Sequence, residues 1–461
     1  MLYVVSDNII YSDVTMEFFE TGKELIDLVR RNPTEENQNK NETLRNIRKD
    51  IGDLTENQNA NAIIEQNNPF FSLRRLTFIM TNACNFRCSY CYEDFYENGK
   101  LNSPKNQIIN INSCIKYVEK ISNIYNKIES ICFFGGEPLL ELNNIQSICK
   151  ELKERGYNIH FSIITNGSIY NDKVYSLLKN YQFSITVSLD GPEEYHNLTR
   201  ISRNGMGTYK NVANNIKNMI TDGLPVSIQG TLTMEHIDKG FGIVDFSKFL
   251  KKEFNISNAH IVPVQYDGNS QIQWNNDAIE KLIKSYLDYD IYNIKKIEEG
   301  RYEDILFSSA FFDVLIAIIN KRRNYLICPS GTELAVSTEG FLYPCFMLVN
   351  KDCIRPLGDL NTPDKIIKNN ILDYIQETMK VNTRFCRSCY AKNICHGCVG
   401  ANVNENKSIN IPSRLLCALT RERVKNVIIY INDLQKDKRQ WKKFVDNFNL
   451  CFSSKRNNYE C

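Results

Sequence analysis

A chain of 461 residues with a net charge of +2 is long enough for two or three domains and too evenly charged to bind nucleic acid over a broad surface. Hydrophobic residues make up 42% and charged residues 24% of it, as in ordinary globular proteins. No apolar stretch approaches the roughly 20 residues of a membrane helix, and the first residues lack the pattern of a secretory signal, so we expect a cytoplasmic protein that binds no membrane. The sixteen cysteines should then be reduced, and such cysteines are more often metal ligands or catalytic groups than disulfides.

The start of the chain differs in texture from the rest. Residues 1–31 predict two short strands, "LYVVS" and "NIIYSD", and an amphipathic helix around "GKELIDLVRR". Residues 32–71 are rich in Asn, Gln and Glu, which indicates a polar linker with one polar helix. We therefore expect a small β-β-α module that is joined by a linker to the main domain.

Strand and helix patterns alternate in residues 72–265, and residues 266–325, which complete the core domain of 72–325, are mostly helical. Six short apolar runs predict strands, at 75–81, 130–134, 158–164, 183–189, 226–232 and 259–264. Amphipathic stretches between them indicate βαβ units and a parallel sheet. Six units are too few for a closed barrel of eight, so we expect an α/β fold with an open, partial (β/α)6 barrel, whose active site lies on the loops after the strands. Cys114, Cys132 and Cys149 fall within these patterns and are expected to be buried apolar residues.

Three cysteines follow the first of these strands. In "TNACNFRCSYCYEDF", Cys84, Cys88 and Cys91 are separated by three and then two residues. A disulfide would leave one thiol over, and a tetrahedral zinc site would lack one ligand. A four-iron cluster is usually held by four thiolates, so a cluster on three thiolates keeps one iron open for a substrate or cofactor. The spacing alone leaves open an incidental cysteine-rich loop, or zinc with a distant fourth ligand.

This triplet and three later motifs together resemble the signature of the radical S-adenosylmethionine (radical SAM) enzymes. Tyr90 stands just before the last cysteine, and the later motifs are "GGEP" at 135–138, "TNG" at 165–167 and "SLDGPEEYHNLTR" at 188–200. Each follows a strand, in the order seen in that superfamily, and the resemblance covers about residues 72–265. It implies that the three cysteines hold a four-iron (4Fe–4S) cluster, whose open iron is bound by the amino and carboxylate groups of SAM.

The resemblance also implies which side chains contact SAM. Gly135 and Gly136 would let the backbone approach the methionine moiety without a side chain in the way. Glu137 would accept hydrogen bonds from the SAM ammonium group. Ser188 would contact the SAM carboxylate.

Further residues are implied, most of them with an alternative. Arg200 or Arg203 would neutralise the SAM carboxylate, and Tyr90 would stack near the adenine. Asn166 would line the SAM pocket, although a turn-forming Asn is nearly as good an interpretation. His196, in the same stretch as Arg200, is as often structural as functional.

A second group of cysteines begins at residue 328. Its spacing resembles the SPASM domain, a C-terminal extension of radical SAM enzymes that modify peptides and proteins, which typically holds two auxiliary four-iron clusters. The resemblance places this domain at residues 326–420 and a basic helical tail at 421–461. It divides the cysteines into a first set, Cys328, Cys345 and Cys398, and a second set, Cys386, Cys389, Cys395 and Cys417.

The match to SPASM has two open points. The family usually has three residues between the cysteines that match Cys395 and Cys398, whereas "CHGC" has two, so the completeness of both clusters is in question. Cys353 could supply a fourth thiolate to the first set, or that site could stay open for a substrate thiolate. A zinc ribbon is the alternative to both clusters, since paired CxxC motifs also suit zinc.

These features imply a radical SAM peptide maturase. It would generate a 5′-deoxyadenosyl radical and modify a ribosomally made precursor peptide by joining a cysteine sulfur to a carbon as a thioether, with a reducing partner such as flavodoxin or ferredoxin. The N-terminal module would recognise the leader of the precursor. The alternative is an anaerobic sulfatase-maturating enzyme. Phe346 disfavours it, because those enzymes carry a catalytic Asp there, and so do the 83 residues before Cys84.

Overall fold

A computed structural model describes residues 1–52, 64, 68–91, 96–97, 100–101, 107–266, 273–307 and 309–453. Its main body is an eight-stranded sheet with the order β11-β10-β9-β8-β7-β4-β12-β13. The strands are β4 (Leu73–Ile79), β7 (Ile128–Phe134), β8 (His160–Thr165), β9 (Ser184–Ser188), β10 (Val226–Leu232), β11 (Ala259–Pro263), β12 (Glu333–Val336) and β13 (Leu342–Tyr343). All neighbouring strands pair in parallel except β12 and β13. A separate pair, β5 (Tyr96–Glu97) and β6 (Lys100–Leu101), is antiparallel.

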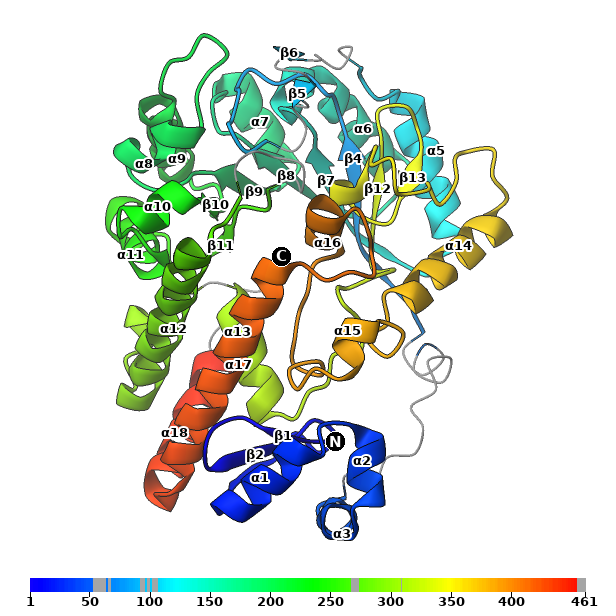
Figure 1. Cartoon of the computed structure of the whole chain (residues 1–461). Coiled ribbons are helices and arrows are strands. Elements are labelled where there is room, and N and C mark those ends of the chain that lie inside the picture. The colour runs from blue at the N-terminus through cyan, green and yellow to red at the C-terminus, as the bar shows by residue number, and fades with distance from the viewer. Residues whose placement is uncertain are drawn as a thin grey trace.

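The six strands predicted between residues 72 and 265 are all present, and the α/β fold with a mostly parallel sheet is confirmed. The intervening helices are α5 (Ile111–Ser122), η1 (Pro138–Glu141), α6 (Leu142–Glu154), α7 (Asp172–Asn180), α8 (Glu193–Thr199), α9 (Tyr209–Thr221), α10 (Met234–Asp238) and α11 (Ile243–Phe254). In Figure 1, α5, α6 and α7 lie along the outer side of the sheet. Because parallel strands point the same way, the loops after them meet at one edge.

Strand β12 was not predicted. It comes from the C-terminal cysteine region, yet it pairs in parallel with β4, from Glu333 opposite Arg75 to Val336 opposite Phe78. It covers an edge of β4 that would otherwise expose unpaired backbone groups. The barrel and the C-terminal region therefore share one sheet.

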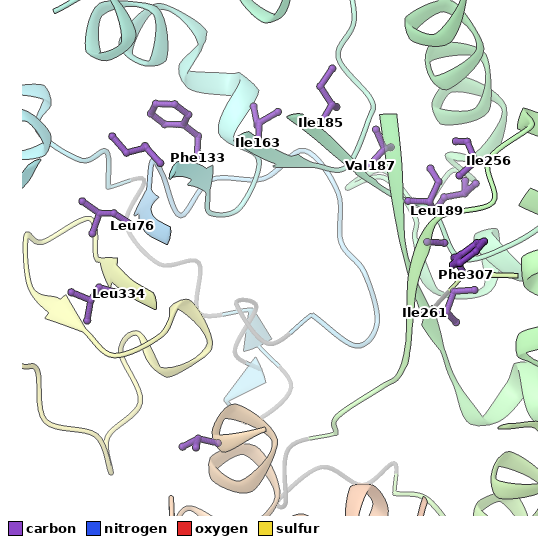
Figure 2. Packing of buried hydrophobic residues seen from close by; sticks show 14 of the residues in the cluster. Leu76, Phe133, Ile163, Ile185, Val187, Leu189, Ile256, Ile261, Phe307 and Leu334 are labelled. Atoms are coloured by element: carbon purple, nitrogen blue, oxygen red, sulfur yellow. The ribbon is translucent and has the colours of Figure 1, made fainter. Parts of the chain in front are cut away.

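Buried apolar side chains hold the sheet against its helices. Figure 2 shows labelled core residues on neighbouring strands, including Leu76, Phe133 and Ile163. The rings of Phe133, Phe161 and Phe183 pack together, with centroids 5.7–6.1 Å apart. This packing makes the strands a rigid frame for the loops at their carboxyl ends.

In its described residues, the N-terminal part contains one strand and one helix more than the sequence predicts, which is two strands, an amphipathic helix and one polar helix in the linker. It has the strands β1 (Leu2–Val4), β2 (Ile9–Ser12) and β3 (Phe18–Glu20) and the helices α1 (Lys23–Arg31), α2 (Glu35–Lys40) and α3 (Glu42–Asp50). Helices α2 and α3 fall in the predicted linker. Gln38 of α2 is buried, and its side-chain amide bonds both the N–H and the C=O of Leu2. Some polar residues of the predicted linker are therefore buried and hydrogen-bonded, while others face the solvent.

The C-terminal half is mostly helical, and several of its helices are long. The helices are α12 (Asn276–Glu299), η2 (Tyr302–Asp304), α13 (Ser309–Ile319), η3 (Phe346–Leu348), α14 (Asp364–Glu377), α15 (Arg384–Arg387), α16 (Val399–Asn406), α17 (Arg414–Gln435) and α18 (Lys438–Ser453). Arg423 of α17 binds Asp290 of α12 through two buried hydrogen bonds of 2.8 and 2.6 Å. The predicted basic tail is thus partly buried, since one side of α17 belongs to the core. None of the helices in the described ranges is long and apolar enough to cross a membrane.

Candidate radical SAM site

The predicted cysteine loop leaves β4 at the carboxyl edge of the sheet. Cys84, Cys88 and Cys91 are each partly exposed. The Cys84 sulfur accepts hydrogen bonds from the Phe86 N–H, at 3.4 Å, and from Asn166 Nδ2, at 3.7 Å. Burial raises the pKa of the Cys84 thiol to about 11. The thiolate therefore needs a bound cation, which a metal cluster supplies.

One side of the loop is held by the segment after α8. The Arg87 N–H donates to the Ile201 carbonyl at 2.8 Å, and the Ser89 N–H donates to the Thr199 carbonyl at 2.9 Å. The Arg203 guanidinium donates to the Cys84 carbonyl. Arg203 therefore orients the loop backbone, which leaves Arg200 as the better candidate for the SAM carboxylate.

The "GGEP" stretch holds the other side. The Gly136 N–H donates to the Thr81 carbonyl, and the Glu137 N–H donates to the Ala83 carbonyl, both at 2.8 Å. A Cβ on Gly136 would overlap with the Ala83 carbonyl, and one on Gly135 with the Thr81 carbonyl. Both glycines are thus required by this close backbone contact. Their predicted contact with the methionine moiety stays a prediction.

Glu137 is fully buried and has partners within the chain. Its carboxylate accepts hydrogen bonds from Thr165 Oγ1 at 2.7 Å, the Asn166 N–H at 2.7 Å and the Leu139 N–H at 3.0 Å. Burial raises the pKa of this carboxyl, and the three donors oppose that rise. Glu137 therefore ties the ends of β7 and β8 together beside the cysteine loop, and its bond to the SAM ammonium stays a prediction.

Arg200, Tyr90 and Asp190 form a connected polar group behind Cys88. Arg200 Nη1 donates to the Tyr90 hydroxyl at 2.7 Å, and that hydroxyl donates to Asp190 Oδ2 at 2.6 Å. Arg200 is 8% exposed, and its Nε has no hydrogen-bond partner in the described part of the chain. Burial opposes its charge, but Cys88, Tyr90 and Asp190 outweigh burial and raise the pKa of Arg200. A buried cation with a spare donor suits a carboxylate ligand.

Asp190 was missed from the sequence. Besides Tyr90 it binds the Thr231 N–H at 2.9 Å and the Thr199 hydroxyl at 3.2 Å, so it joins three segments of the barrel. The sequence feature that could have pointed to Asp190 is its position in "SLDGP", directly after β9. His196 is fully buried with both ring nitrogens in hydrogen bonds, to the Asp190 N–H and to Thr208, which shows a structural role.

Asn166 and Ser188, also predicted to contact SAM, differ in whether their side chains have hydrogen-bond partners within the protein. Asn166 is 5% exposed, and its Nδ2 binds Asn85 Oδ1 at 2.8 Å as well as the Cys84 sulfur. Ser188 ends β9, is half-buried, and makes no side-chain hydrogen bond that involves only described residues. Asn166 therefore orients a predicted cluster ligand, while the Ser188 hydroxyl is available to a ligand.

The first auxiliary set comes together from three segments. Cys328 precedes β12, Cys345 follows β13, and Cys398 is the N-cap of α16. Burial and the nearby Cys398 together raise the pKa of Cys328 to about 11. Burial and Cys398 likewise raise the pKa of Cys345. Cys353 is exposed and has no polar contact with these cysteines within the described ranges.

The second auxiliary set also comes together. Burial and, after it, neighbouring cysteines of the set raise the pKa of Cys386 to about 11 and that of Cys417 to about 12. Cys395 and Cys389 are among those neighbours. A cavity of about 340 Å³ reaches Cys389 and Cys417 and opens beside Phe385, which is 61% exposed.

The donor sets fit iron–sulfur clusters. Among the described residues, no three His, Cys, Asp or Glu side chains converge as the ligands of one metal ion do. Ligands of a four-iron cluster bind different irons and need not converge on one point. Several buried thiols grouped together repel one another once ionised, unless a cationic centre lies between them. The cysteines are therefore of the right chemical type, sufficiently buried and grouped closely enough to bind iron–sulfur clusters.

Comparison with known proteins identifies the barrel. Residues 78–239 match the model of the Radical SAM superfamily. The radical SAM cyclopropyl synthase TigE of Paramaledivibacter caminithermalis is 26% identical, over 79% of this chain and 77% of its own. A cysteine-type anaerobic sulfatase-maturating enzyme of Clostridium novyi is 25% identical, over 74% of this chain and 90% of its own.

Two solved structures share the fold. Native anSMEcpe with bound AdoMet superimposes with a TM-score of 0.61 and 20% identity, covering 78% of this chain and 99% of that one. Streptococcus suis SuiB bound to its precursor peptide SuiA gives a TM-score of 0.54 and 14% identity, covering 89% and 96%. At these identities the likeness extends to the fold alone.

Proposed function

The chain is a radical SAM enzyme, whose superfamily uses a four-iron cluster and SAM, and we propose that it is a maturase of a ribosomally made precursor peptide. The observation that carries the proposal is the grouping of seven buried or half-buried thiols into two sets beside the barrel. Relatives named as sulfatase-maturating enzymes support a peptide or protein substrate.

When bound, the cluster at the cysteine loop supplies the electron that cleaves SAM to methionine and a 5′-deoxyadenosyl radical. Cys84, Cys88 and Cys91 would hold it, and the Asn166 amide would hydrogen-bond the Cys84 sulfur. Arg200 would bind the SAM carboxylate with its spare donors, and Ser188 would add a hydroxyl. Flavodoxin or ferredoxin would serve as the reductant.

We propose that the modification is a thioether. Joining a cysteine thiol to a C–H carbon removes two hydrogens from the peptide. The radical takes one as a hydrogen atom, the thiol gives up the other as a proton, and one electron remains to be accepted. Two auxiliary clusters, held by the first and second sets, would provide that acceptor inside the protein, and the electron would then leave to an external one-electron carrier.

Sulfatase maturation remains the second candidate, because several of the similar proteins carry that name. The surroundings of Phe346 weigh against it. Its ring packs edge-on against Phe134, with centroids 5.0 Å apart, and the Arg75 guanidinium lies 5.9 Å from its centroid. A phenyl ring cannot accept a proton, so this position offers no base.

The N-terminal module is proposed to bind the leader of the precursor. It lies against the loop that carries the second set: Asp13 forms a 2.6 Å ion pair with Lys392, and the rings of Tyr3 and Tyr390 are 6.3 Å apart. Asn393 also donates to the Asp13 carbonyl. A leader bound to this module would therefore lie near the second set.

The test uses reconstituted protein under anaerobic conditions, with SAM, dithionite and a small cysteine-rich peptide encoded beside the gene. We expect 5′-deoxyadenosine and a peptide that has lost two hydrogens and one alkylatable thiol. The same peptide with its cysteines changed to Ala should not lose mass, and a leaderless peptide should react poorly. Formylglycine formed on a sulfatase-derived peptide, with no change in the precursor, would favour the second candidate instead.

A further inference from the structure

Lys380 is a buried cation between α14 and α15. It is 3% exposed, and its ammonium group donates to three backbone carbonyls. These belong to Asn324 at 2.8 Å, Lys392 at 2.6 Å and Cys395 at 2.6 Å. All three N–H groups are therefore satisfied by neutral acceptors, and the charge itself is not cancelled by these bonds.

The strongest negative partners of Lys380 are cysteines. No carboxylate lies within ion-pair distance of it in the described residues, whereas four cysteines interact with it electrostatically. Cys395, Cys386 and Cys389 of the second set act most strongly, and Cys328 of the first set acts least. Burial lowers the pKa of Lys380, and these cysteines oppose that shift. An ammonium buried without a counter-charge is strongly destabilising. The thiolates of a bound cluster are the available counter-charge.

We propose that Lys380 is the internal counter-ion of the cluster at Cys386, Cys389, Cys395 and Cys417, and that it makes this cluster easier to reduce than the one at the first set. The inference rests on the cluster assignments of the proposed function. Reduction adds one electron and changes no bond, so a fixed positive charge nearby stabilises the reduced form by Coulomb attraction. That attraction is strong where water is excluded.

The first set has a different electrostatic environment. Its nearby cation is Arg75, whose guanidinium binds Glu333 at 2.8 Å. Both members of this pair act on Cys345, and Glu333 also acts on Cys398. The Arg75–Glu333 pair is close to neutral overall. Arg74 also binds Glu333, but its side chain is 58% exposed, so its charge is screened by water. The asymmetry favours electron transfer from the first set toward the second.

Three variants separate charge from mere anchoring. Lys380→Gln keeps hydrogen-bond donors and removes the charge, whereas Lys380→Arg keeps the charge. Lys392→Gln is the matched control, because Lys392 lies in the next loop, between Cys389 and Cys395, and its charge is already paired with Asp13 at 2.6 Å. Each is made in a Cys84, Cys88 and Cys91 to Ala background, so that only auxiliary clusters contribute.

The readouts are iron content and a potentiometric titration followed by electron paramagnetic resonance. In K380Q we expect one cluster to become harder to reduce by about tenfold in its equilibrium constant, or 59 mV for one electron. K380R and K392Q should stay near the parent. Loss of iron in K380Q alone also supports a charge role.

Equal effects of K380Q and K380R, or unchanged potentials with iron intact in K380Q, would overturn the inference. A parent protein that binds no auxiliary iron would instead refute the cluster assignments of the proposed function. The two failures are therefore distinguishable.

Discussion

The cysteine loop at 84–91 and the cysteine region from 328 to 417 hold their thiols in different ways. The loop carries three cysteines on one short segment, and its shape depends on backbone contacts with segments that contribute no cysteine, such as Gly136 and Thr199. The C-terminal region collects seven cysteines from turns and helix ends spread over 90 residues of sequence. Segments that contain no cysteine fix the positions of the thiols in the loop. In the C-terminal region, the packing of the cysteine-containing segments against one another fixes them.

This difference predicts which substitutions should disturb cluster binding in each region. Around the loop, residues that bind no iron are expected to matter almost as much as the ligands, because they fix the backbone. In the C-terminal region the ligands should be separable, since each set comes from several segments. Predictions that affect one region and spare the other test this contrast.

The largest effect is expected from replacing Cys84, Cys88 and Cys91 together by Ala. The variant should lose the iron of one cluster and all SAM cleavage, because three thiolates are its only expected protein ligands. Iron bound by the C-terminal sets should remain. Iron and sulfide per protein, with chromatography of 5′-deoxyadenosine, measure both effects. Cys114→Ala, in buried α5, is the control and should change neither; full iron in the triple variant contradicts the assignment.

Gly136→Ala should have the next largest effect, although Gly136 binds no metal. The added Cβ would overlap with the Ala83 carbonyl, and relief would break the hydrogen bonds between the two segments. Overpacking of this kind costs about 1–3 kcal/mol. We expect low occupancy of the SAM cluster and little cleavage, with auxiliary iron intact. Gly22→Ala is the control, since nothing lies within 4 Å of its added Cβ; equal behaviour of both variants would remove the contact argument.

The barrel and its motifs could be predicted from the sequence because their signals are local. Strands covered on both faces read as continuous apolar runs, and each motif directly follows a run. Strand β12 could not be predicted, because its pairing of Glu333 with Arg75 joins residues far apart in the chain. The roles of Gly135 and Gly136 were assigned to a ligand, since a sequence shows which residue lacks a side chain and not which backbone it faces.

The N-terminal segment shows a further limit. Phe18 and Phe19 of β3 stand together rather than alternating with polar residues, so the period of a strand was hidden. In α2, a buried Gln38 satisfies an edge strand, and a polar side chain in that role looks like a linker residue in the sequence. Asp190 was overlooked for a related reason: its importance comes from three partners that only the fold brings together.

A smaller effect is expected from Glu137→Gln. The amide keeps the size of the side chain but removes the charge that would face the SAM ammonium, and hydrogen bonds to charged groups contribute roughly 1.5–3 kcal/mol. SAM should bind about tenfold or more weakly by calorimetry, with iron retained. Glu141→Gln, four residues on, is the control. If the variant instead loses part of its cluster, and the protein that keeps the cluster binds SAM normally, Glu137 acts only through its hydrogen bonds with Thr165, Asn166 and Leu139.

The smallest effect, and the one that distinguishes the two auxiliary sets, is expected from Cys353→Ala. The first set has three cysteines, and a four-iron cluster normally has four thiolates. Cys353 is exposed and lacks polar contact with Cys328, Cys345 and Cys398 in the described structure, which favours an iron left open for a substrate thiolate. The variant should therefore match the parent in iron content and resonance spectrum without peptide. Addition of a cysteine-containing precursor should then alter one auxiliary spectrum equally in both proteins. A cluster that is lost or altered in the peptide-free variant would show that Cys353 is the fourth ligand and that the first set is closed to substrate.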